Sequence, residues 1–529
     1  MALIFVLFWS LVVVAAAAVW RAAEWLWLRP RRLDRALRAQ GLRGSRYRIP
    51  NGDLKEDVRL VVEARRKPIP LSHRITHRVV PYLHRAMDLY GSKGLFNVLM
   101  GGSKLSFSWI GPSPRVMILD PEIIREVLST KFGHFEKPKG NPYGKFLALG
   151  VATYDGEKWA KHRRIINPAF HVEKLKVMIP AFSACCDELM SRWEDLASSK
   201  GSCELNVWPE FQRFSGDAIS RAAFGSSYKE GRRIFELQLE QAQLLMEATQ
   251  SVYFPGLRFL PTQKNRRRRE LLREVVGILK SMIEQRQNAI RQGKSSNNDL
   301  LSLLLESNLQ HSKEQGNHSK QIGLTTEEVI EECKLFYFAG QETTSVLLTW
   351  TMILLSMHPS WQERARDEIL QTFGKNKPDF DGLSRLKVVT MILYEVLRLY
   401  PPGHFLTRET YKEIKLGEFN FPPGVQLLLP IILIHHSTEL WGEDAEEFNP
   451  ERFAEGVSKA TNNQLIFFPF GWGPRICVGQ NFALTEAKMC LATILQRFSV
   501  ELSPSYAHAP CTVLILQPQH GAQLILHKL

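Results

Sequence analysis

The chain has 529 residues, of which 44% are apolar, and it carries a formal net charge of +14. A sequence of this length and composition can bury a large core, which excludes a disordered polypeptide. The basic surplus predicts an anionic partner: a nucleic acid, a membrane surface or an acidic protein. The position of the charges along the chain has to decide among these three.

The first stretch of the chain, MALIFVLFWSLVVVAAAAVW, contains no charged side chain. As a helix rising about 1.5 Å per residue, it spans roughly 30 Å, the thickness of a hydrocarbon core. A cleaved signal peptide is the alternative, but it would begin with a basic region and have a shorter apolar run. We therefore expect residues 1–28 to be a retained, single-pass transmembrane anchor, with Trp25 and Trp27 at the membrane interface.

A basic segment, RPRRLDRALR, follows the anchor and contains Arg29, Arg31, Arg32, Arg35 and Arg38. Cytoplasmic flanks of membrane helices are enriched in such residues, which predicts that the following domain faces the cytosol. We interpret residues 29–50 as a basic hinge marked by Pro30. The seven cysteines form no CxxC pair, so neither disulfides nor a zinc site is expected.

Residues 51–529 are predicted to form a single large domain, because no linker and no internal repeat divides them. The most polar stretch, 291–323, contains its own apolar run, which favours a surface connection within that domain. Helical periodicity dominates, as in 271–290, whereas strand-like segments such as 115–119 and 425–433 are short. The expected fold class is mainly α with small β-sheets.

A basic helix is predicted at 157–170, EKWAKHRRIINPAF, where Trp159 and Arg163 lie four residues apart. Arginine pairs well with carboxylates, so a helix of this composition could bind an acidic group. A basic helix face that meets solvent is the alternative reading, and it remains open for Lys161, His162 and Arg164.

A helix of about thirty residues, roughly 45 Å long, is predicted from Leu324 to Pro359, because Thr325 and Glu328 form a capping box before a long apolar run. Its middle contains residues that weaken a helix: Gly340, Thr343 and Thr344. Glycine costs about 1 kcal/mol there relative to alanine. A polar patch on a surface helix is the alternative, but the apolar flanks CKLFYF and VLLTWTMILL disfavour it. The pattern therefore indicates a functional site in a buried helix.

Glu395 and Arg398 lie three residues apart in MILYEVLRLYPP, which places them on one helix face. Such a pair on a protein surface contributes only a few tenths of a kcal/mol. Apolar residues surround it here, and two prolines end the helix. On these residues alone, a surface salt bridge and a buried pair both remain open.

The segment FPFGWGPRICVG at 468–479 places Cys477 just before a strongly periodic apolar helix. A cysteine at a helix start is favoured as thiolate, which suits a nucleophile or a metal ligand. The loop also carries an arginine that could pair a carboxylate, Arg475, and glycines that let a flat ligand approach, Gly471, Gly473 and Gly479. A dinucleotide-binding turn is excluded, because Ile476 stands at its third glycine position. The pattern favours a planar, carboxylate-bearing cofactor held by sulfur.

The loop resembles the haem-binding signature of the cytochrome P450 superfamily, F-x-x-G-x-R-x-C-x-G, with matches at Phe470, Gly473, Arg475, Cys477 and Gly479. The resemblance extends over the chain after the anchor, and 106–138 and 434–453 are similar to the plant 72 clan. It implies the cytochrome P450 fold, with haem b bound at 51–529 and its iron ligated by Cys477. A thiolate ligand favours heterolytic cleavage of the O–O bond.

The resemblance also implies roles on the distal side of the haem, in the motif A-G-x-[DE]-T-T at 339–344. There, Gly340 would leave room for dioxygen, while Thr343 and Glu342 would be the catalytic residues that hydrogen-bond activated oxygen and deliver protons. The haem propionates would be bound by Trp159, Arg163, Arg408 and Arg475.

Glu395 and Arg398 match the family motif E-x-x-R, and Arg452 matches its P-E-R-F partner. This match implies a buried network of Glu395, Arg398 and Arg452 that supports folding on the cysteine side of the haem. No proton transfer has to pass through it.

The function implied is a membrane-bound haem-thiolate monooxygenase that oxidises a small apolar substrate, such as a terpenoid, a hormone or a xenobiotic, with dioxygen. Because the sequence shows no flavin or nicotinamide module, electrons from NADPH would arrive through a partner reductase in the endoplasmic reticulum membrane. Basic residues such as Lys161, His162 and Arg164 would help to dock it. No nucleic acid is expected, since the arginine run at 266–269 fits a solvated helix start or a lipid contact.

Two other functions remain open: a reductase-independent enzyme that rearranges or dehydrates a peroxide, and a haem carrier or sensor without turnover. Glu342 and Thr343 argue against both. The substrate pocket is expected near Phe146, Phe254 and Phe405. An insert at 92–102 departs from the 72 clan and is expected to be a dispensable loop or an error in the gene model.

Overall fold

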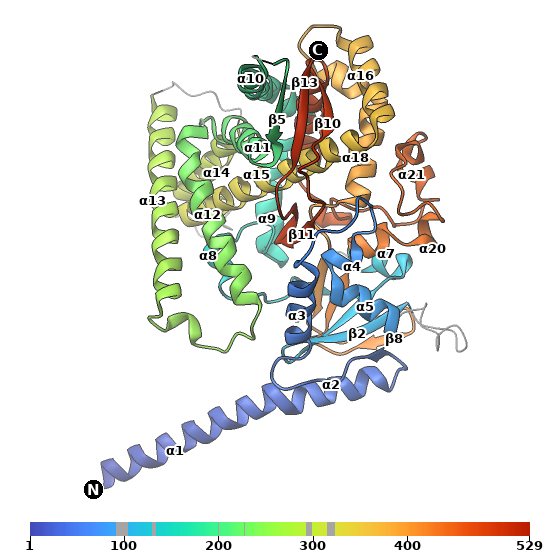
Figure 1. Cartoon of the computed structure of the whole chain (residues 1–529). Helices are drawn as coiled ribbons and strands as arrows, with labels where there is room; N and C mark the ends of the chain where they lie inside the picture. The colour runs from blue at the N-terminus through green and yellow to red at the C-terminus, as the bar shows by residue number, and fades with distance from the viewer. Residues whose placement is uncertain (91–103, 130–133, 199, 227, 293–298, 315–322) are drawn as a thin grey trace.

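Helices make up most of this computed structural model, and small sheets gather beside them (Figure 1). The structure describes residues 1–90, 104–129, 134–198, 200–226, 228–292, 299–314 and 323–529. The insert expected at 92–102 lies outside the described residues. The expected fold class, mainly α with small β-sheets, is confirmed.

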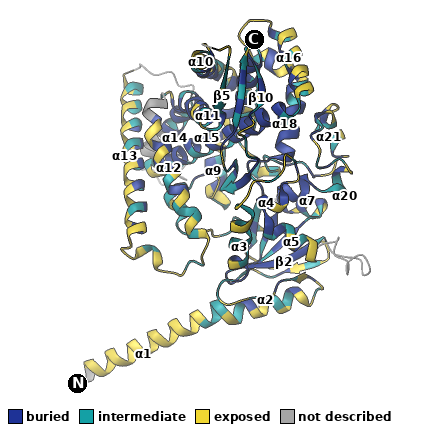
Figure 2. Cartoon of the chain, viewed as in Figure 1, coloured by how far each residue is buried: buried dark blue, intermediate teal, exposed yellow. Residues whose placement is uncertain are grey.

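The N-terminal helix α1 (Ala2–Ala23) projects from the body of the protein and is exposed along its length (Figure 2). It continues through a π-helical turn, Glu24–Leu28, directly into α2 (Arg29–Arg38). By length and composition this helical run could cross a membrane, as an anchor requires.

Pro30 does not break this helix, contrary to the expected hinge. Proline has no N–H to donate to the carbonyl of the preceding turn. The hydroxyl of Tyr47 donates to the carbonyl oxygen of Leu26 at 2.9 Å and supplies a hydrogen bond in its place. The helix ends only after Arg38, because α2 packs its apolar side chains Leu33 and Leu37 into the core of the sheet region.

The largest sheet has six strands in the order β1 (Arg43–Gly44), β2 (Leu105–Ile110), β3 (Ser113–Ile118), β9 (Gln426–Leu429), β6 (Leu406–Thr410) and β4 (Phe135–Glu136). The strands β2 and β3 form an antiparallel hairpin in which Leu105 pairs with Ile118. In the neighbouring pair, β6 runs antiparallel to β9, and Arg408 is opposite Leu427. This register brings Arg408 to the functional site described below.

Three smaller sheets complete the β-structure. One is formed by β10 (Phe498–Leu502), β13 (Gln523–Lys528) and β5 (Ser202–Asn206). The other two are the pairs β11 (Pro510–Val513) with β12 (Ile515–Pro518) and β7 (Ile414–Leu416) with β8 (Phe419–Phe421).

The helix α15 (Thr326–Met357) crosses the helical region and is buried on all sides over much of its length (Figure 1). It begins with the predicted capping box: the N–H of Glu328 donates to Oγ1 of Thr325 at 3.2 Å, and the N–H of Thr325 donates to Oε2 of Glu328 at 3.1 Å. Among the helices that pack against it are α11, α18 and α22, and a fourth helix, α10, packs against α11 and α22.

These four helices are α10 (Val172–Ala197), α11 (Val207–Phe224), α18 (Lys387–Leu399) and α22 (Gln480–Leu495). The remaining described α-helices are α3 (Leu54–Ala64), α4 (Thr76–Val79), α5 (Pro81–Tyr90), α7 (Pro121–Ser129), α8 (Gly144–Leu147), α9 (Gly156–Ile166), α12 (Tyr228–Thr249), α13 (Gln263–Arg291), α14 (Leu300–Glu314), α16 (Pro359–Phe373), α17 (Phe380–Arg385), α19 (Ile431–His435), α20 (Thr438–Trp441) and α21 (Val457–Ala460).

The Glu395–Arg398 pair on α18 is completely buried, which excludes a surface salt bridge. The guanidinium donates from Nη2 to Oε1 of Glu395 at 2.7 Å and from Nε to Oε2 at 2.8 Å. Arg452 approaches the same carboxylate at 3.8 Å, but its closest partner is the carboxylate of Asp444, at 2.8 Å. The network therefore extends from the buried pair to the half-buried Asp444, a residue that the sequence analysis did not predict.

Candidate active site

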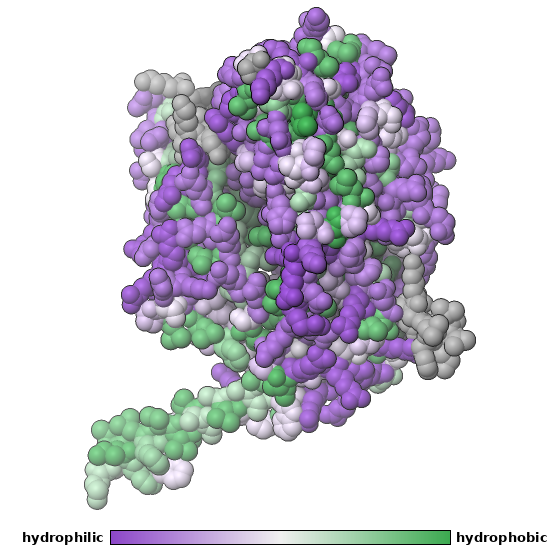
Figure 3. All heavy atoms as spheres, viewed as in Figure 1, coloured by the Kyte–Doolittle hydropathy of each residue, from purple (hydrophilic) through white to green (hydrophobic). Residues whose placement is uncertain are grey.

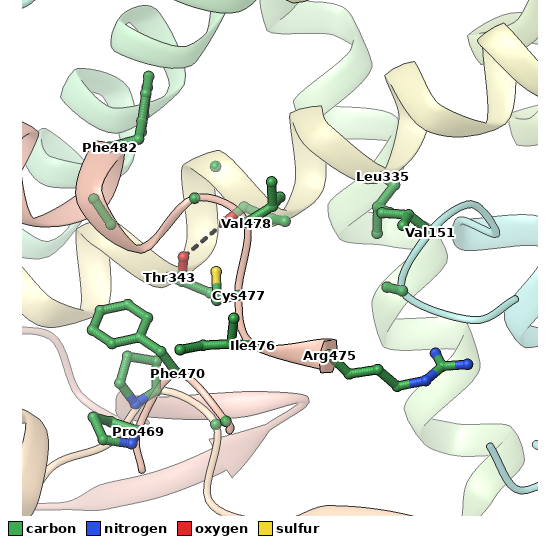
Figure 4. A pocket seen from close by; sticks show the side chains of 18 of the residues that line it. Val151, Leu335, Thr343, Pro469, Phe470, Arg475, Ile476, Cys477, Val478 and Phe482 are labelled. Atoms are coloured by element: carbon green, nitrogen blue, oxygen red, sulfur yellow. Dashed lines mark hydrogen bonds between the residues drawn. The ribbon is translucent and has the colours of Figure 1, made fainter. Parts of the chain in front are cut away.

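A cavity of about 360 Å³ lies between α9, α15, β6 and the loop that precedes α22 (Figure 4). Its walls are largely apolar and include Val151, Leu335, Phe336, Leu347, Ile431 and Phe482. The side chains of Cys477 on the loop and Thr343 on α15 both face this space. Its size is within the range of ordinary small-molecule sites, about 300–1,000 Å³.

Cys477 follows a short 3₁₀ turn, Gly473–Arg475, and its N–H donates to the carbonyl oxygen of Phe470 at 2.8 Å. Its thiol is exposed to the cavity, but protein surrounds that cavity. This enclosure raises the pKa of the Cys477 thiol, whereas the N–H of Gly479 and the guanidinium of Arg163 act in the opposite direction. The helix start alone therefore does not produce the thiolate, and a bound cation would be needed to favour it.

The glycines of this loop differ in whether the surrounding protein leaves room for a side chain. Gly473 adopts a φ of +69° and lies against the backbone of Leu128, so no other residue fits there without strain. A Cβ added to Gly479 would lie 4.0 Å from Sγ of Cys477 and 4.0 Å from Phe170, which is ordinary contact. The protein atoms around Gly479 therefore leave room for a side chain.

A cluster of cations lines one part of the cavity: Lys137, Arg163, Arg408 and Arg475. Arg475 pairs with the carboxylate of Asp155 and donates to the carbonyl of Tyr154 at 2.9 Å. Arg163 and Arg408 donate instead to backbone carbonyls, at 2.7 and 2.9 Å. Among the described residues, Asp155 is the one carboxylate within ion-pair distance of the cluster. The cluster therefore has positive charge available for an anionic ligand.

Burial makes this excess charge costly without a ligand. It lowers the pKa of Arg408 to about 10, with a further contribution from Arg475. It also lowers the pKa of Lys137 to about 7, where Arg408 and Arg475 add to the effect of burial. Lys137 was missed by the sequence analysis, because the stretch EKPK carries no periodic or motif signal.

Trp159 and Arg163 on α9 reach the same cavity, as the sequence analysis expected. Trp159 is buried, and Cζ of Arg475 lies 4.7 Å from the centre of its ring. Such a cation–π contact fixes the guanidinium beside the indole. The structure thus brings together the four residues predicted to bind acidic groups: Trp159, Arg163, Arg408 and Arg475.

The distal residues of α15 do not all face the cavity. Thr343 lines it, and its Oγ1 donates to the carbonyl of Ala339 at 2.8 Å. Glu342 instead turns toward α11, where Oε1 accepts a hydrogen bond of 3.5 Å from Nε2 of Gln212. Burial raises the pKa of Glu342 to about 7. Gly340 lines the cavity but also packs against Ile219 of α11.

Replacing Gly340 with alanine is expected to destabilise the protein. An added Cβ would lie 2.5 Å from Cγ1 of Ile219, so α11 and α15 would have to move apart. Overpacking of this kind costs about 1–3 kcal/mol, which thermal unfolding can measure. Gly277→Ala on α13 is the matched control, because a Cβ there meets no atom within 4 Å. Equal unfolding temperatures for the two variants would contradict the packing argument.

Glu342→Gln is expected to change how stability depends on pH. A buried carboxyl with a raised pKa stabilises the fold in its neutral form, and that contribution is lost as pH rises from 4.5 through about 7. The amide cannot ionise, so the variant should gain stability relative to the natural protein by up to roughly 3 kcal/mol between pH 5 and pH 8. Unfolding temperatures at both values test this. Glu173→Gln, at an exposed position on α10, should show no such difference.

The expectation of a pocket near Phe146, Phe254 and Phe405 holds only in part, because none of these three rings lines the cavity but Gly403 and Leu406, on either side of Phe405, do. Phe254 lies beyond the end of α12, where its ring meets Trp25 at 5.9 Å. His162 is fully buried, so it cannot belong to a docking surface as the sequence analysis suggested.

Comparisons with known proteins identify the family of this chain. A family model described as Cytochrome P450 matches residues 103–526. Cytochrome P450 CYP72A616 of Paris polyphylla is 65% identical over 520 residues, which cover 98% of each chain. The 11-oxo-beta-amyrin 30-oxidase of Glycyrrhiza uralensis is 53% identical over 98% of this chain and 97% of that protein.

A solved structure, retinoic acid bound cyanobacterial CYP120A1, matches with a TM-score of 0.69 over 83% of this chain and 94% of the other. Its sequence identity is 22%, so this likeness concerns the fold. Together, the family model and the relatives of the 72A group show that the chain belongs to the cytochrome P450 family and is a haem-dependent monooxygenase.

Proposed function

We propose that this enzyme is a membrane-anchored monooxygenase that oxidises a triterpenoid-like apolar substrate, with Cys477 as the ligand of haem iron. The observation that carries the proposal is the largely apolar cavity in which one thiol and a cluster of four cations line the same space. One 53% identical relative is named as an oxidase of an amyrin. Substrate recognition by apolar walls would suit such a molecule.

The residues of the cavity fit haem on two grounds. Cys477 supplies a sulfur ligand, and its neighbour Arg163 favours the thiolate. Lys137, Arg408 and Arg475 together carry more positive charge than Asp155 can balance, and this excess would suit a ligand with two carboxylates. When bound through a thiolate, haem supplies the activation of dioxygen that oxygen insertion needs.

The distal residues would manage water and protons around that group. The largely apolar walls would disfavour bulk water in the cavity, and the hydroxyl of Thr343, which donates to the carbonyl of Ala339, lines the same space. Glu342 has a pKa of about 7, so it can both give and accept a proton near neutral pH. Because its carboxyl meets Gln212 on α11, we infer that protons reach Thr343 from that side.

Arg408→Met is expected to weaken haem retention. It removes one cation while keeping a side chain of similar length. A hydrogen bond to a charged group is worth about 1.5–3 kcal/mol, so haem should dissociate roughly tenfold to a hundredfold faster. Transfer of haem to apomyoglobin measures the rate. Arg266→Met, at an exposed site on α13, is the control, and equal rates for the two variants would contradict the assignment.

We also propose that the protein lies on the cytosolic side of the endoplasmic reticulum membrane, with residues 1–28 as anchor, 29–50 as a basic connecting segment and 51–529 as the catalytic domain. Exposed apolar residues near the end of α12 support this placement: Phe254, Leu257, Phe259 and Leu260. Figure 3 shows apolar surface along α1 and where α12 and α13 meet. Phe254 packs against Trp25 at the end of the anchor.

Electrons would come from NADPH through a separate flavoprotein reductase, whose acidic surface would meet exposed basic residues such as Arg164 on α9. Incubation of the purified enzyme with reductase, NADPH and a panel of triterpenoids tests the proposed function. Oxidised products that require both NADPH and the reductase would support it. Product formation from a peroxide without either would favour a rearranging enzyme, and no turnover of any substrate would favour a carrier.

A further inference from the structure

A buried ionisable pair joins α9 to α15 next to the cavity but outside its lining. Nδ1 of His162 lies 2.6 Å from Oε1 of Glu332, and both side chains are completely inaccessible. Whether the pair is ionic or neutral, one proton is shared between these two atoms. Within the described chain, Nε2 of His162 and Oε2 of Glu332 make no hydrogen bond. The contact between Nδ1 and Oε1 is therefore the one side-chain hydrogen bond that the described structure gives either residue.

The neighbours of the pair belong to three different segments. On α9, Lys158 pairs with Glu328 at 3.2 Å, and Glu328 approaches Nε2 of His162 at 3.5 Å. On α15, the adjacent Glu331 accepts a hydrogen bond from Lys334 at 3.0 Å. These groups are the charged partners that surround the pair.

The third segment is the loop before α9. Its Gly150 lies so close to Glu332 that an added Cβ would be 2.7 Å from Oε2. The ring of Tyr154 packs on the ring of His162, with centroids 4.8 Å apart. The carbonyl of Tyr154 in turn accepts a hydrogen bond from Arg475 at 2.9 Å. The pair is thus the point at which α9, α15 and this loop meet.

His162 lies on α9 between two residues that line the cavity, Trp159 and Arg163. Glu332 lies about three helical turns before Thr343 on α15. A hydrogen bond between the two helices therefore fixes the cationic part of the cavity relative to the distal part. Loss of this hydrogen bond would let α9 shift, although no residue that lines the cavity would have been replaced.

We propose that His162 and Glu332 are positioning residues that hold Trp159 and Arg163 against the acidic groups of the bound cofactor. The proposal rests on the proposed function, since it assumes that haem occupies this cavity. His162 is buried and does not line the cavity, so its role would be exerted through the position of α9. The role differs from simple stabilisation, because it predicts faster loss of haem from protein that is still folded.

The test compares haem loss from five holoenzymes: the natural protein, His162→Leu, His162→Asn, the double variant His162→Leu with Glu332→Leu, and a control variant. Haem loss to apomyoglobin should be roughly tenfold faster for His162→Leu, the size of effect typical of residues that orient a ligand. His162→Asn places an amide N–H where Nδ1 lies, so its rate should stay within about twofold of the natural protein. Glu157→Gln, an exposed position on α9, is the matched control.

The double variant separates positioning from the penalty of an unpaired buried charge. Two leucines leave no lone polar group, so this protein should fold, and its haem loss should remain fast because the link between α9 and α15 is absent. Restored retention in the double variant would overturn the proposal. A lower unfolding temperature with unchanged haem loss in His162→Leu would overturn it as well, by showing a structural role only.

The proposed function is checked separately, through the absorption of the reduced carbon monoxide complex of the natural protein. If that complex lacks the thiolate signature, the proposed function fails whatever the His162 variants do. If the signature is present and His162→Leu retains haem as Glu157→Gln does, only the positioning role fails.

Discussion

Cys477→Ser is expected to abolish monooxygenase activity, with product formation falling to background, while the protein remains folded. A serine hydroxyl does not ionise at neutral pH, so it cannot replace a thiolate as donor to iron. The side chain faces the cavity and not the packed core, which is why the fold should tolerate the change. Haem content, turnover with reductase and unfolding temperature are the three measurements.

The control for this variant is Cys203→Ser. Cys203 lies half-buried in β5, and it is not among the residues that line the cavity. We expect this protein to keep its haem and its turnover. Full activity in Cys477→Ser would show that another residue binds the iron.

Arg398→Ala is expected to have the largest effect on stability. It removes both hydrogen bonds to Glu395 and also those that Arg398 donates to the carbonyls of His435 at 2.7 Å and Ala445 at 2.6 Å. Removing one partner of a buried pair leaves an uncompensated charge and costs about 3–5 kcal/mol, a large part of the stability of most domains. Low yield of soluble, haem-loaded protein and early thermal unfolding should result.

Arg232→Ala provides the comparison, because Arg232 and Glu236 form an exposed pair on α12 at 2.9 Å. Exposed pairs contribute little, so this variant should differ from the natural protein by less than about 1 kcal/mol. Equal stability of Arg398→Ala and Arg232→Ala would contradict a folding role for the network of Glu395, Arg398 and Arg452.

Local patterns predicted the parts of the structure whose partners lie close in sequence. The capping box of Thr325 and Glu328 and the pair of Glu395 and Arg398 each involve residues three apart, so helical geometry alone brings them together. The family resemblance, which depends on the spacing around Cys477, was confirmed by the family model.

Contacts between distant segments were not predictable in this way. The side chain of Ile219 on α11 leaves no room for a Cβ at Gly340 of α15. Gln212, also on α11, donates a hydrogen bond to Glu342 of α15. No periodicity in α15 identifies either neighbour. Lys137 likewise joins the cations of the cavity only because the fold brings it beside Arg408.

The hinge expected at Pro30 is another case in which a contact with a distant residue could not be predicted from local sequence. Proline predicts a break from its own chemistry, but the hydroxyl of Tyr47 reaches the carbonyl of Leu26 and the helix continues. Whether proline interrupts a helix depends on such a partner. Its position could be known only from the folded chain.

The central claim is that the thiolate of Cys477 binds haem iron. The most direct measurement is the absorption spectrum of the purified protein after reduction under carbon monoxide. We predict the long-wavelength Soret band of a thiolate-ligated complex, and its loss in Cys477→Ser. A folded, haem-loaded natural protein whose carbon monoxide complex shows the band of a nitrogen-ligated haem would contradict the account.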